Sequence, residues 1–181
     1  MELNEKQENE RLKYEALLYT NYGSMNHGRF TYNLVSSYEP CFVVDFGCGR
    51  NNYINHLKTL NIKGVGIDFV FPEADIICPM HKVPIEDNIA DVIVAFDSLE
   101  HLLTEDVDAV FKEMQRIAKN NAHFVFSICT RESRRTSLGQ NLHPTVKPTS
   151  WWIEKLSNYA IVDKEKYKSI YITGKFLKDI K

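Results

Sequence analysis

The sequence predicts a doubly wound α/β fold, with a mainly parallel sheet, helices on both faces and a single domain. Three features of the 181 residues support this expectation. Apolar segments typical of buried strands recur along the chain, segments with helical spacing lie between them, and a glycine-containing turn follows the first apolar segment. Strands that alternate with helices of this length favour a parallel sheet, and the chain is too short for two ordinary domains.

Residues 1–40 are expected to form a helical segment ahead of the sheet and to cap the ligand site. Residues 3–20 are charged and contain neither Gly nor Pro, and their apolar residues recur at helical spacing from Leu12 to Tyr19. A helix is therefore expected there, ended by Gly23. A short second helix is expected before residue 40.

The sheet, within a second segment of residues 41–181, is expected to begin at residues 41–46. Their sequence CFVVDF is continuously apolar up to the aspartate and is closed by glycines, which is typical of a buried parallel strand. A helix is expected over residues 51–60, because apolar side chains fall on one side of it: Tyr53, Ile54, Leu57 and Leu60. A strand over residues 62–68 and a shorter one over 74–77 follow.

The second half of the sheet is expected to alternate in the same way. Residues 91–96, DVIVAF, form an apolar strand after the initial aspartate, and residues 122–129 form the next. The helix between them, over residues 106–119, has its apolar residues at helical spacing.

The C-terminal region begins with a polar loop over residues 130–149. A loop of this length is too long to be idle in a compact domain, so a functional role is expected. A helix follows, with Thr149 or Ser150 as its N-cap. Two strand-like segments, around 160–164 and 168–173, close the chain.

The composition indicates a globular protein, with 44% hydrophobic and 25% charged residues. Lys and Arg total 22 against 24 Asp and Glu, which argues against binding nucleic acid or anionic membrane through bulk charge. No apolar run approaches the ~20 residues of a membrane span, and the acidic start is not expected of a secretory signal. The four cysteines lack a C-x-x-C pair, so no metal site is predicted and a reduced, cytoplasmic chain is expected.

A candidate ligand loop follows the first predicted strand. Gly47 and Gly49 let the main chain turn sharply and approach a ligand closely, immediately after Asp45. Asp68 ends the second strand, where a carboxylate can accept hydrogen bonds from ribose hydroxyls. In open α/β sheets ligands bind at such strand ends, so a nucleoside-containing cofactor is predicted.

Two cofactors suit this arrangement. A dinucleotide requires G-x-G-x-x-G, but Asn52 stands at the last glycine position, and Asp45 would repel a pyrophosphate. S-adenosylmethionine carries an ammonium and a sulfonium and no phosphate, so a carboxylate at Asp45 favours it. Charge therefore selects S-adenosylmethionine. If the loop binds no ligand, its glycines instead form an ordinary tight turn.

Three segments in this order, VVDFGCGRN, GVGIDF and DVIVAFDSLEHL, resemble the class I S-adenosylmethionine-dependent methyltransferases over about residues 41–130. The resemblance implies a Rossmann-like, seven-stranded sheet and methyl transfer from S-adenosylmethionine. It also implies that Asp45, Gly47 and Gly49 frame the methionine portion, that Asp68 binds the ribose, and that Phe69 flanks the adenine. The full set expected to bind the cofactor is Asp45, Gly47, Cys48, Gly49, Asp68, Phe69, Met80, Asp97 and Ser98.

Two positions depart from the family pattern. Asn51 stands where the family has its third loop glycine, and Cys78-Pro79-Met80 stand where an acid often contacts the adenine amine. Main-chain groups and apolar packing are therefore expected to hold the adenine. Asp97 and Ser98 are similar to the segment beneath the transferred methyl group, and Glu100-His101-Leu102 is similar to a frequent E-H-L at the start of the following helix. Their structural alternatives are a helix cap for Asp97 and a packed helix residue for His101.

The acceptor of the methyl group is expected to contact segments outside the sheet, namely residues 22–32 and the loop 130–149. The residues predicted to bind it are His27, Arg29, Arg131, Arg134, Arg135, Lys147 and Trp151. The basic side chains suit an anionic acceptor, and the tryptophan suits a sugar ring or base. His143 is a candidate general base, and the candidate catalytic set is His143, His101 and Asp97. The alternative for the basic residues is a solvated loop.

The favoured function is methyl transfer to an oxygen or nitrogen of a polar, anionic, glycan-like small molecule. The run from Arg131 to Trp152 also resembles small bacterial or phage methyltransferases. Transfer to a nucleotide or nucleic acid is less favoured, because the chain has Phe96-Asp97-Ser98-Leu99 where amino-group DNA methyltransferases have D-P-P-Y. Two more functions stay open, a catalytically inactive binding or regulatory subunit and, less favoured, a nicotinamide-dependent oxidoreductase. No membrane partner is expected.

Overall fold

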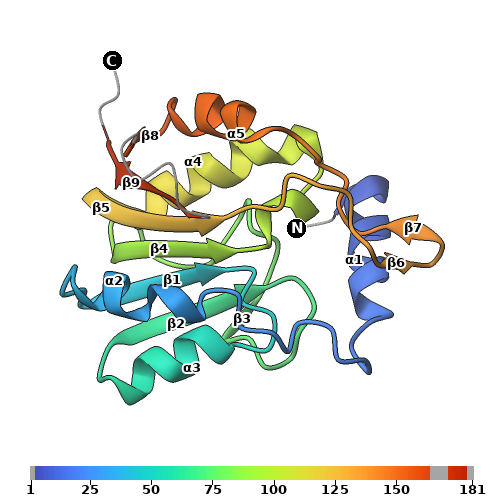
Figure 1. Ribbon diagram of the computed structural model, residues 1–181, viewed down its shortest axis with the longest axis horizontal. Helices are drawn as coiled ribbons and strands as arrows, with labels where there is room; N and C mark the ends of the chain where they lie inside the picture. Colours follow the sequence, from blue (N-terminus) through green and yellow to red (C-terminus); the bar gives the residue numbers. More distant parts are fainter. Residues whose placement is uncertain (1–2, 164–170, 179–181) are drawn as a thin grey trace.

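The computed structural model describes residues 3–163 and 171–178 and has a central seven-stranded sheet within them (Figure 1). The strand order is β3-β2-β1-β4-β5-β9-β8. The strands are β1 (Phe42–Phe46), β2 (Lys63–Asp68), β3 (Ile76–Ile77), β4 (Ala90–Phe96), β5 (Ala118–Ser127), β8 (Ala160–Val162) and β9 (Ile172–Phe176). The first five pair in parallel, whereas β9 pairs antiparallel with both β5 and β8. The predicted mainly parallel sheet is confirmed.

The strand order reverses between β1 and β4. From β1 the chain continues outward through β2 and β3 on one side, and from β4 it continues to β5 on the other. The carboxyl ends of β1 and β4 therefore flank a crevice, which is where open α/β sheets bind their ligands.

Helices cover both faces of the sheet. They are α1 (Glu5–Glu15), α2 (Tyr32–Ser36), α3 (Asn52–Thr59), α4 (Val107–Ile117) and α5 (Thr149–Leu156), with short 3-10 turns η1 (Arg29–Thr31), η2 (Leu99–His101) and η3 (Thr104–Asp106). Alternate residues of β4 enter opposite cores: Ile93 packs with the α4 and α5 side, and Val92 packs with the α2 and α3 side. Burial on both faces explains why β1, β4 and the end of β5 are continuously apolar.

The N-terminal helix lies beyond the carboxyl ends of the strands, beside a small hairpin (Figure 1). The hairpin consists of β6 (Thr136–Ser137) and β7 (Gln140–Asn141), and both residues of its turn have positive φ. The Ser137 hydroxyl donates to the Lys13 carbonyl at 2.8 Å, and the Lys13 ammonium donates to the Asn141 carbonyl at 3.2 Å. These contacts join the first helix to the loop 130–149.

Most element boundaries match the sequence prediction, with three corrections. The first helix ends at Glu15 and not near residue 20, because turns replace it there. Neither Thr149 nor Ser150 caps α5: the N-cap is Pro148, and no side chain makes the capping hydrogen bond. The last strand begins at Ile172, and residues 168–170 of the predicted strand lie outside the described residues.

The cysteine side chains and the helices bear on two further predictions from the sequence. All four cysteines are free thiols. No described helix is long and apolar enough to cross a membrane.

Candidate active site

The loop after β1 has the sharp bend that its glycines predict. Gly47 and Gly49 have φ of +80° and +53°, and the Gly47 and Cys48 amides both donate to the Ile67 carbonyl of β2. A Cβ on Gly47 would lie 2.4 Å from the Ser98 Cβ and 2.8 Å from the Met80 Cε. Only glycine fits there, because the ends of β1 and β4 approach each other closely around it.

Asn51, at the position of the family's third loop glycine, adopts a backbone conformation that glycine also tolerates. Its φ of +58° is left-handed, a region that asparagine tolerates better than most residues. Its side-chain amide donates to the Glu73 carbonyl and to the Asp75 carboxylate. Asn51 therefore supplies the left-handed residue and also ties the loop to the segment after β2.

Asp68 holds the glycine loop together at the end of β2. Its carboxylate accepts from the Gly49 amide at 2.9 Å, the Val70 amide at 3.0 Å and the Phe71 amide at 3.2 Å. Burial raises the pKa of Asp68, and the amide donors oppose that rise. The predicted ribose-binding acid is therefore also a structural anchor for the loop.

Asp45, the last acid of β1, is 3% exposed. Its Oδ1 has no hydrogen-bond partner among residues 3–163 and 171–178. Burial, with the nearby Asp68, raises the pKa of Asp45 to about 8. A buried carboxyl oxygen without a donor is costly, so this position favours a ligand that brings a cation or a hydrogen-bond donor.

A cavity of about 440 Å³ lies over the glycine loop, within the range of ligand pockets. Its acids come from α1, the strand ends and the turns after β4: Glu10, Asp45, Asp68, Asp97, Glu100 and Asp106. Among the described residues, its lining includes one arginine, Arg135, and no lysine. This excess of acids suits a cationic cofactor and opposes a pyrophosphate.

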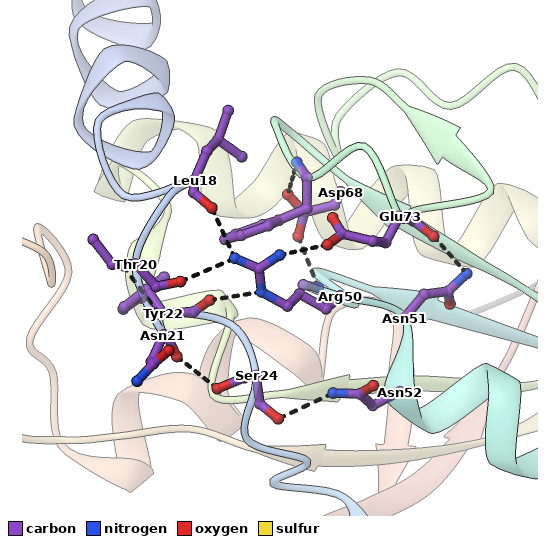
Figure 2. A network of polar contacts seen from close by, with 12 residues as sticks. Leu18, Thr20, Asn21, Tyr22, Ser24, Arg50, Asn51, Asn52, Asp68 and Glu73 are labelled. Atoms are coloured by element: carbon purple, nitrogen blue, oxygen red, sulfur yellow. Dashed lines mark hydrogen bonds and ion pairs between the residues drawn. The ribbon is translucent and has the colours of Figure 1, made fainter.

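The N-terminal segment after α1 covers one side of the cavity, and Arg50 holds it there (Figure 2). The Arg50 guanidinium donates to the Leu18 carbonyl at 2.8 Å, the Thr20 carbonyl at 3.0 Å and the Tyr22 carbonyl at 3.3 Å, and it pairs with Glu73. The Asn52 amide donates to the Ser24 carbonyl at 3.0 Å. Residues 18–24 are thereby fastened to the glycine loop.

Aromatic rings beside this segment also line the cavity. The Tyr22 ring stacks on Phe71 with centroids 6.4 Å apart, and Arg50 lies 5.2 Å above the Phe71 ring. Phe69, Phe71, Pro79, Met80 and His81 line the same region. These side chains form a largely apolar wall at the place where the sequence predicts adenine packing.

Asp97 and His27 meet at the end of β4. His27 Nδ1 lies 2.8 Å from the Asp97 Oδ2, and the Ser127 hydroxyl donates to the Asp97 Oδ1 at 2.9 Å. Although burial acts to raise it, the pKa of Asp97 is lowered below its ordinary value by His27 and Ser127. The hydrogen bond that His27 donates to Asp97 correspondingly raises the pKa of His27. Asp97 is not a helix cap, which corrects the structural alternative.

His101 lies in a polar cluster at the other end of the cavity. Its Nδ1 is 2.7 Å from both the Tyr14 hydroxyl and the Leu142 carbonyl, and its Nε2 is 3.4 Å from the Tyr22 hydroxyl. Burial lowers the pKa of His101 to about 4, so the ring is neutral near pH 7. The His143 ring packs edge-on against it at 4.7 Å.

Glu100 lies beside His101 and is fully buried. Its Oε1 accepts from the Cys129 amide at 3.0 Å. Burial raises the pKa of Glu100 to about 8. Two buried acids of the site, Asp45 and Glu100, are therefore protonated over much of the neutral range in the free protein.

The structure brings together most of the predicted site residues. All nine predicted cofactor residues line the cavity, as do the three predicted catalytic residues. Of the predicted acceptor residues, His27 and Arg135 line it. The others lie outside its lining: Arg29, Arg131, Arg134, Lys147 and Trp151. Lys147 and Trp151 instead contact each other, with the ammonium 5.9 Å from the ring centroid.

The lining residues that were not predicted as site residues include Tyr14, Tyr22 and Glu100. Glu100 belongs to the E-H-L motif and could have been found through its position beside His101. Tyr14 carried no comparable signal, because helical spacing places it on a helix but does not indicate what that helix contacts.

Replacing Asp45 by asparagine is expected to flatten the pH dependence of stability. The folded protein keeps the Asp45 proton up to a pKa of about 8, whereas the unfolded chain loses it near 3.8. The free energy of unfolding should therefore fall as pH rises from about 4 to 8, by up to about 1.4 kcal/mol per pH unit for this group. Asp45→Asn removes that contribution and leaves the similar one of Glu100. Urea denaturation between pH 5 and 8 measures it, and equal slopes for variant and parent would contradict the assignment.

Comparisons with known proteins agree with the geometry. A family model described as a methyltransferase domain matches residues 31–162. A search of curated proteins finds no match.

Solved structures share the fold at low identity. A Pyrococcus horikoshii protein is 17% identical, with 92% of this chain and 95% of that chain covered and a TM-score of 0.68. The Burkholderia thailandensis 1,6-didemethyltoxoflavin-N1-methyltransferase, solved with 1,6-didemethyltoxoflavin and S-adenosylhomocysteine, is 12% identical, with 98% and 92% covered and a TM-score of 0.69. A chain of the complex between the Haloferax volcanii Trm112 methyltransferase activator and a methyltransferase is 13% identical, with 91% and 97% covered and a TM-score of 0.64.

Proposed function

Because the chain belongs to the methyltransferase domain family, whose model matches residues 31–162, we propose that it methylates an oxygen or nitrogen of a polar small molecule with an anionic group. The family assignment confirms the resemblance predicted from the three sequence segments. The protein is an S-adenosylmethionine-dependent methyltransferase. The nature of the acceptor and the roles of individual residues are the proposal.

The observation that carries the proposal is the Asp45 Oδ1, which is buried beside the glycine loop without a partner among the residues that the structure describes. Together with the acids that line the cavity, it suits a ligand with an ammonium and a sulfonium. A carboxylate that gains a cationic partner recovers the energy lost by its burial. The residues present therefore fit S-adenosylmethionine.

When bound, S-adenosylmethionine supplies a methyl group made electrophilic by the positively charged sulfur. The chain's own task is to align the acceptor with that methyl group, which is catalysis by proximity. We assign Asp45, Gly47 and Gly49 to the methionine portion and Asp68 to the ribose. Phe69 and Met80, with Cys48 at the loop, pack against the remainder of the nucleoside.

The acceptor is assigned to the end of the cavity formed by α1, η2 and the hairpin. His101 is neutral near pH 7, and its Nε2 and that of His143 are the nitrogens left to receive the hydrogen of an acceptor hydroxyl. Asp97 and Ser98 lie between this end and the glycine loop, and the His27 contact keeps Asp97 ionised. His27 and Asp97 position the acceptor, whereas the two other histidines contact its reactive group.

The predicted anionic group of the acceptor is assigned to Arg135. It is exposed and lines the cavity, and its positive charge acts to lower the pKa of Tyr22, against the larger rise caused by burial. Its neighbour Arg134 is equally exposed but lies outside the lining. The two arginines therefore form a matched pair for testing whether charge at the cavity selects the acceptor.

Arg135→Ala is expected to raise the Michaelis constant for the acceptor about tenfold, corresponding to ~1.4 kcal/mol, whereas Arg134→Ala should leave it unchanged. The acceptor is first found by incubating the protein with methyl-labelled S-adenosylmethionine and a cell extract separated on an anion exchanger. Label in the retained fractions supports an anionic acceptor, and label confined to the unretained fractions contradicts it. Binding of S-adenosylhomocysteine without label in any fraction would instead indicate a binding subunit.

A further inference from the structure

Three side chains that commonly bind transition metals converge at the acceptor end of the cavity. Glu100, His101 and His143 each offer one potential ligand atom, and these atoms lie within 4.8 Å of one another. Glu100 and His101 belong to η2, which follows β4, and His143 follows the hairpin. The sequence predicts no metal site, because the fold and not a short spacing brings these ligands together.

Both histidines have the hydrogen bonds that orient metal ligands. His101 Nδ1 lies 2.7 Å from the Leu142 carbonyl, and His143 Nδ1 lies 2.7 Å from the Arg131 carbonyl. A carbonyl oxygen can only accept, so each Nδ1 carries the hydrogen and each Nε2 keeps its lone pair. Metal-binding histidines are typically fixed in this way, with the other ring nitrogen donating to a carbonyl or carboxylate.

The Tyr14 hydroxyl supports the same tautomer of His101. It donates to the Leu142 carbonyl at 2.8 Å, so its oxygen is available to accept from the His101 Nδ1 at 2.7 Å. Tyr14 is thus a positioning residue that fixes the ring and directs Nε2 away from the carbonyl. The Tyr22 hydroxyl lies 3.4 Å from this nitrogen.

Glu100 supplies an oxygen that lacks a partner. The side chain is 0% exposed, and its Oε1 is occupied by the Cys129 amide. Its Oε2 has no hydrogen-bond partner in residues 3–163 or 171–178. A cation that replaces the proton of this buried carboxyl group would give Oε2 a partner, and the two imidazoles beside it offer lone pairs and no hydrogen on Nε2.

We propose that Glu100, His101 and His143 bind a divalent first-row transition-metal ion. Ligand atoms about 2.0–2.2 Å from such an ion lie roughly 3–4 Å from one another, so the observed cluster needs only a small contraction. The two imidazoles favour Zn²⁺ over Mg²⁺ and Ca²⁺, which prefer oxygen ligands, and the carboxylate also suits Mn²⁺. Three protein ligands leave coordination positions open, as in catalytic metal sites.

The role of the ion rests on the proposed function, because the cluster lines the cavity assigned to the acceptor. The open positions suit a hydroxyl oxygen of the acceptor, and a bound cation lowers the pKa of that hydroxyl. With both Nε2 lone pairs holding the ion, the hydroxyl proton would pass to water and not to a histidine. The oxygen would then form the new C–O bond, and the C–S bond of the donor would break with its electron pair left on sulfur. The inferred substrate class is therefore a hydroxylated molecule methylated on oxygen.

Calorimetry on chelator-treated full-length protein tests the metal site directly, with Zn²⁺ and Mn²⁺ as probes and Mg²⁺ for comparison. The parent is expected to bind one equivalent of Zn²⁺ or Mn²⁺ tightly. His143→Ala should weaken binding at least 100-fold, and Glu100→Gln should do the same if it folds. His56→Ala is the matched control, since His56 is exposed and contacts only Tyr32 among the described ring pairs. It should bind the ion as the parent does.

Two results would overturn the proposal: no binding of either ion by the parent, or equal binding by His143→Ala and the parent. Thermal denaturation shows whether each variant is folded, and His143→Ala removes a partly exposed side chain whose loss the fold should tolerate. Titration of the same metal-free samples with S-adenosylhomocysteine tests the methyltransferase assignment separately. Methyl transfer at an unchanged rate after chelation would refute the role of the ion in catalysis.

Discussion

Gly47→Ala is expected to abolish cofactor binding and to lower the free energy of unfolding by about 2–5 kcal/mol. A left-handed backbone costs an L residue with a Cβ about 1–2 kcal/mol, and overpacking adds about 1–3 kcal/mol. Both conditions hold at Gly47, whose φ is +80° and whose added Cβ would lie 2.4 Å from the Ser98 Cβ. The clash would separate the ends of β1 and β4, between which the cofactor site lies.

Gly139→Ala is the matched control for this prediction. Gly139 has a similar φ of +73°, but an added Cβ there would meet nothing within 4 Å. It should show the backbone cost alone, about 1–2 kcal/mol, and unchanged binding of S-adenosylhomocysteine. Urea denaturation and calorimetry measure the two effects. Equal stability and equal affinity of the two variants would show that the close approach at Gly47 does not shape the site.

Asp68→Ala is expected to weaken binding of S-adenosylhomocysteine by more than about 100-fold. Two hydrogen bonds from ribose hydroxyls to a carboxylate contribute about 1.5–3 kcal/mol each. The structure adds a second reason. The same carboxylate accepts from the Gly49, Val70 and Phe71 amides, so its removal also leaves the glycine loop without its anchor.

Two further variants separate these contributions. Asp68→Asn keeps one side-chain oxygen for the amides and should bind the cofactor more tightly than Asp68→Ala. Asp91→Asn is the matched control, because Asp91 also accepts from backbone amides, those of Cys41 at 3.0 Å and Phe42 at 2.8 Å, but lies outside the cavity lining. Its affinity should stay near that of the parent. Equal calorimetric affinity for parent and Asp68→Ala would refute the ribose assignment.

The convergence of the residues proposed to bind the cofactor could be predicted from the sequence because its determinants are local. Asp45, Gly47 and Gly49 are adjacent in the chain, and Asp68 ends the neighbouring strand, so strand order alone brings them together. The buried strands could be predicted as readily, because burial on both faces leaves an apolar run in the sequence. Asn51 shows the limit of motif matching, since it adopts a left-handed conformation although it is not a glycine.

The acceptor half could not be predicted in the same way, since its determinants are contacts between distant segments. Tyr14 meets His101 only because α1 packs beside the hairpin, and no periodicity in α1 indicates that neighbour. The path of the loop 130–149 depends on the bond from Ser137 to the Lys13 carbonyl. That path places Arg135 at the cavity and Arg134 outside its lining, a distinction absent from the sequence pattern.

The bonds between α1 and the hairpin have a consequence for engineering. The sheet and its glycine loop supply the proposed cofactor site, whereas much of the proposed acceptor end comes from these two appended segments, which are joined through Lys13 and Tyr14. Exchanging either segment alone for that of another enzyme would break the hydrogen bonds at their shared boundary. Substrate preference should therefore be transplanted by replacing both segments as one unit, with the nucleoside-binding scaffold left intact.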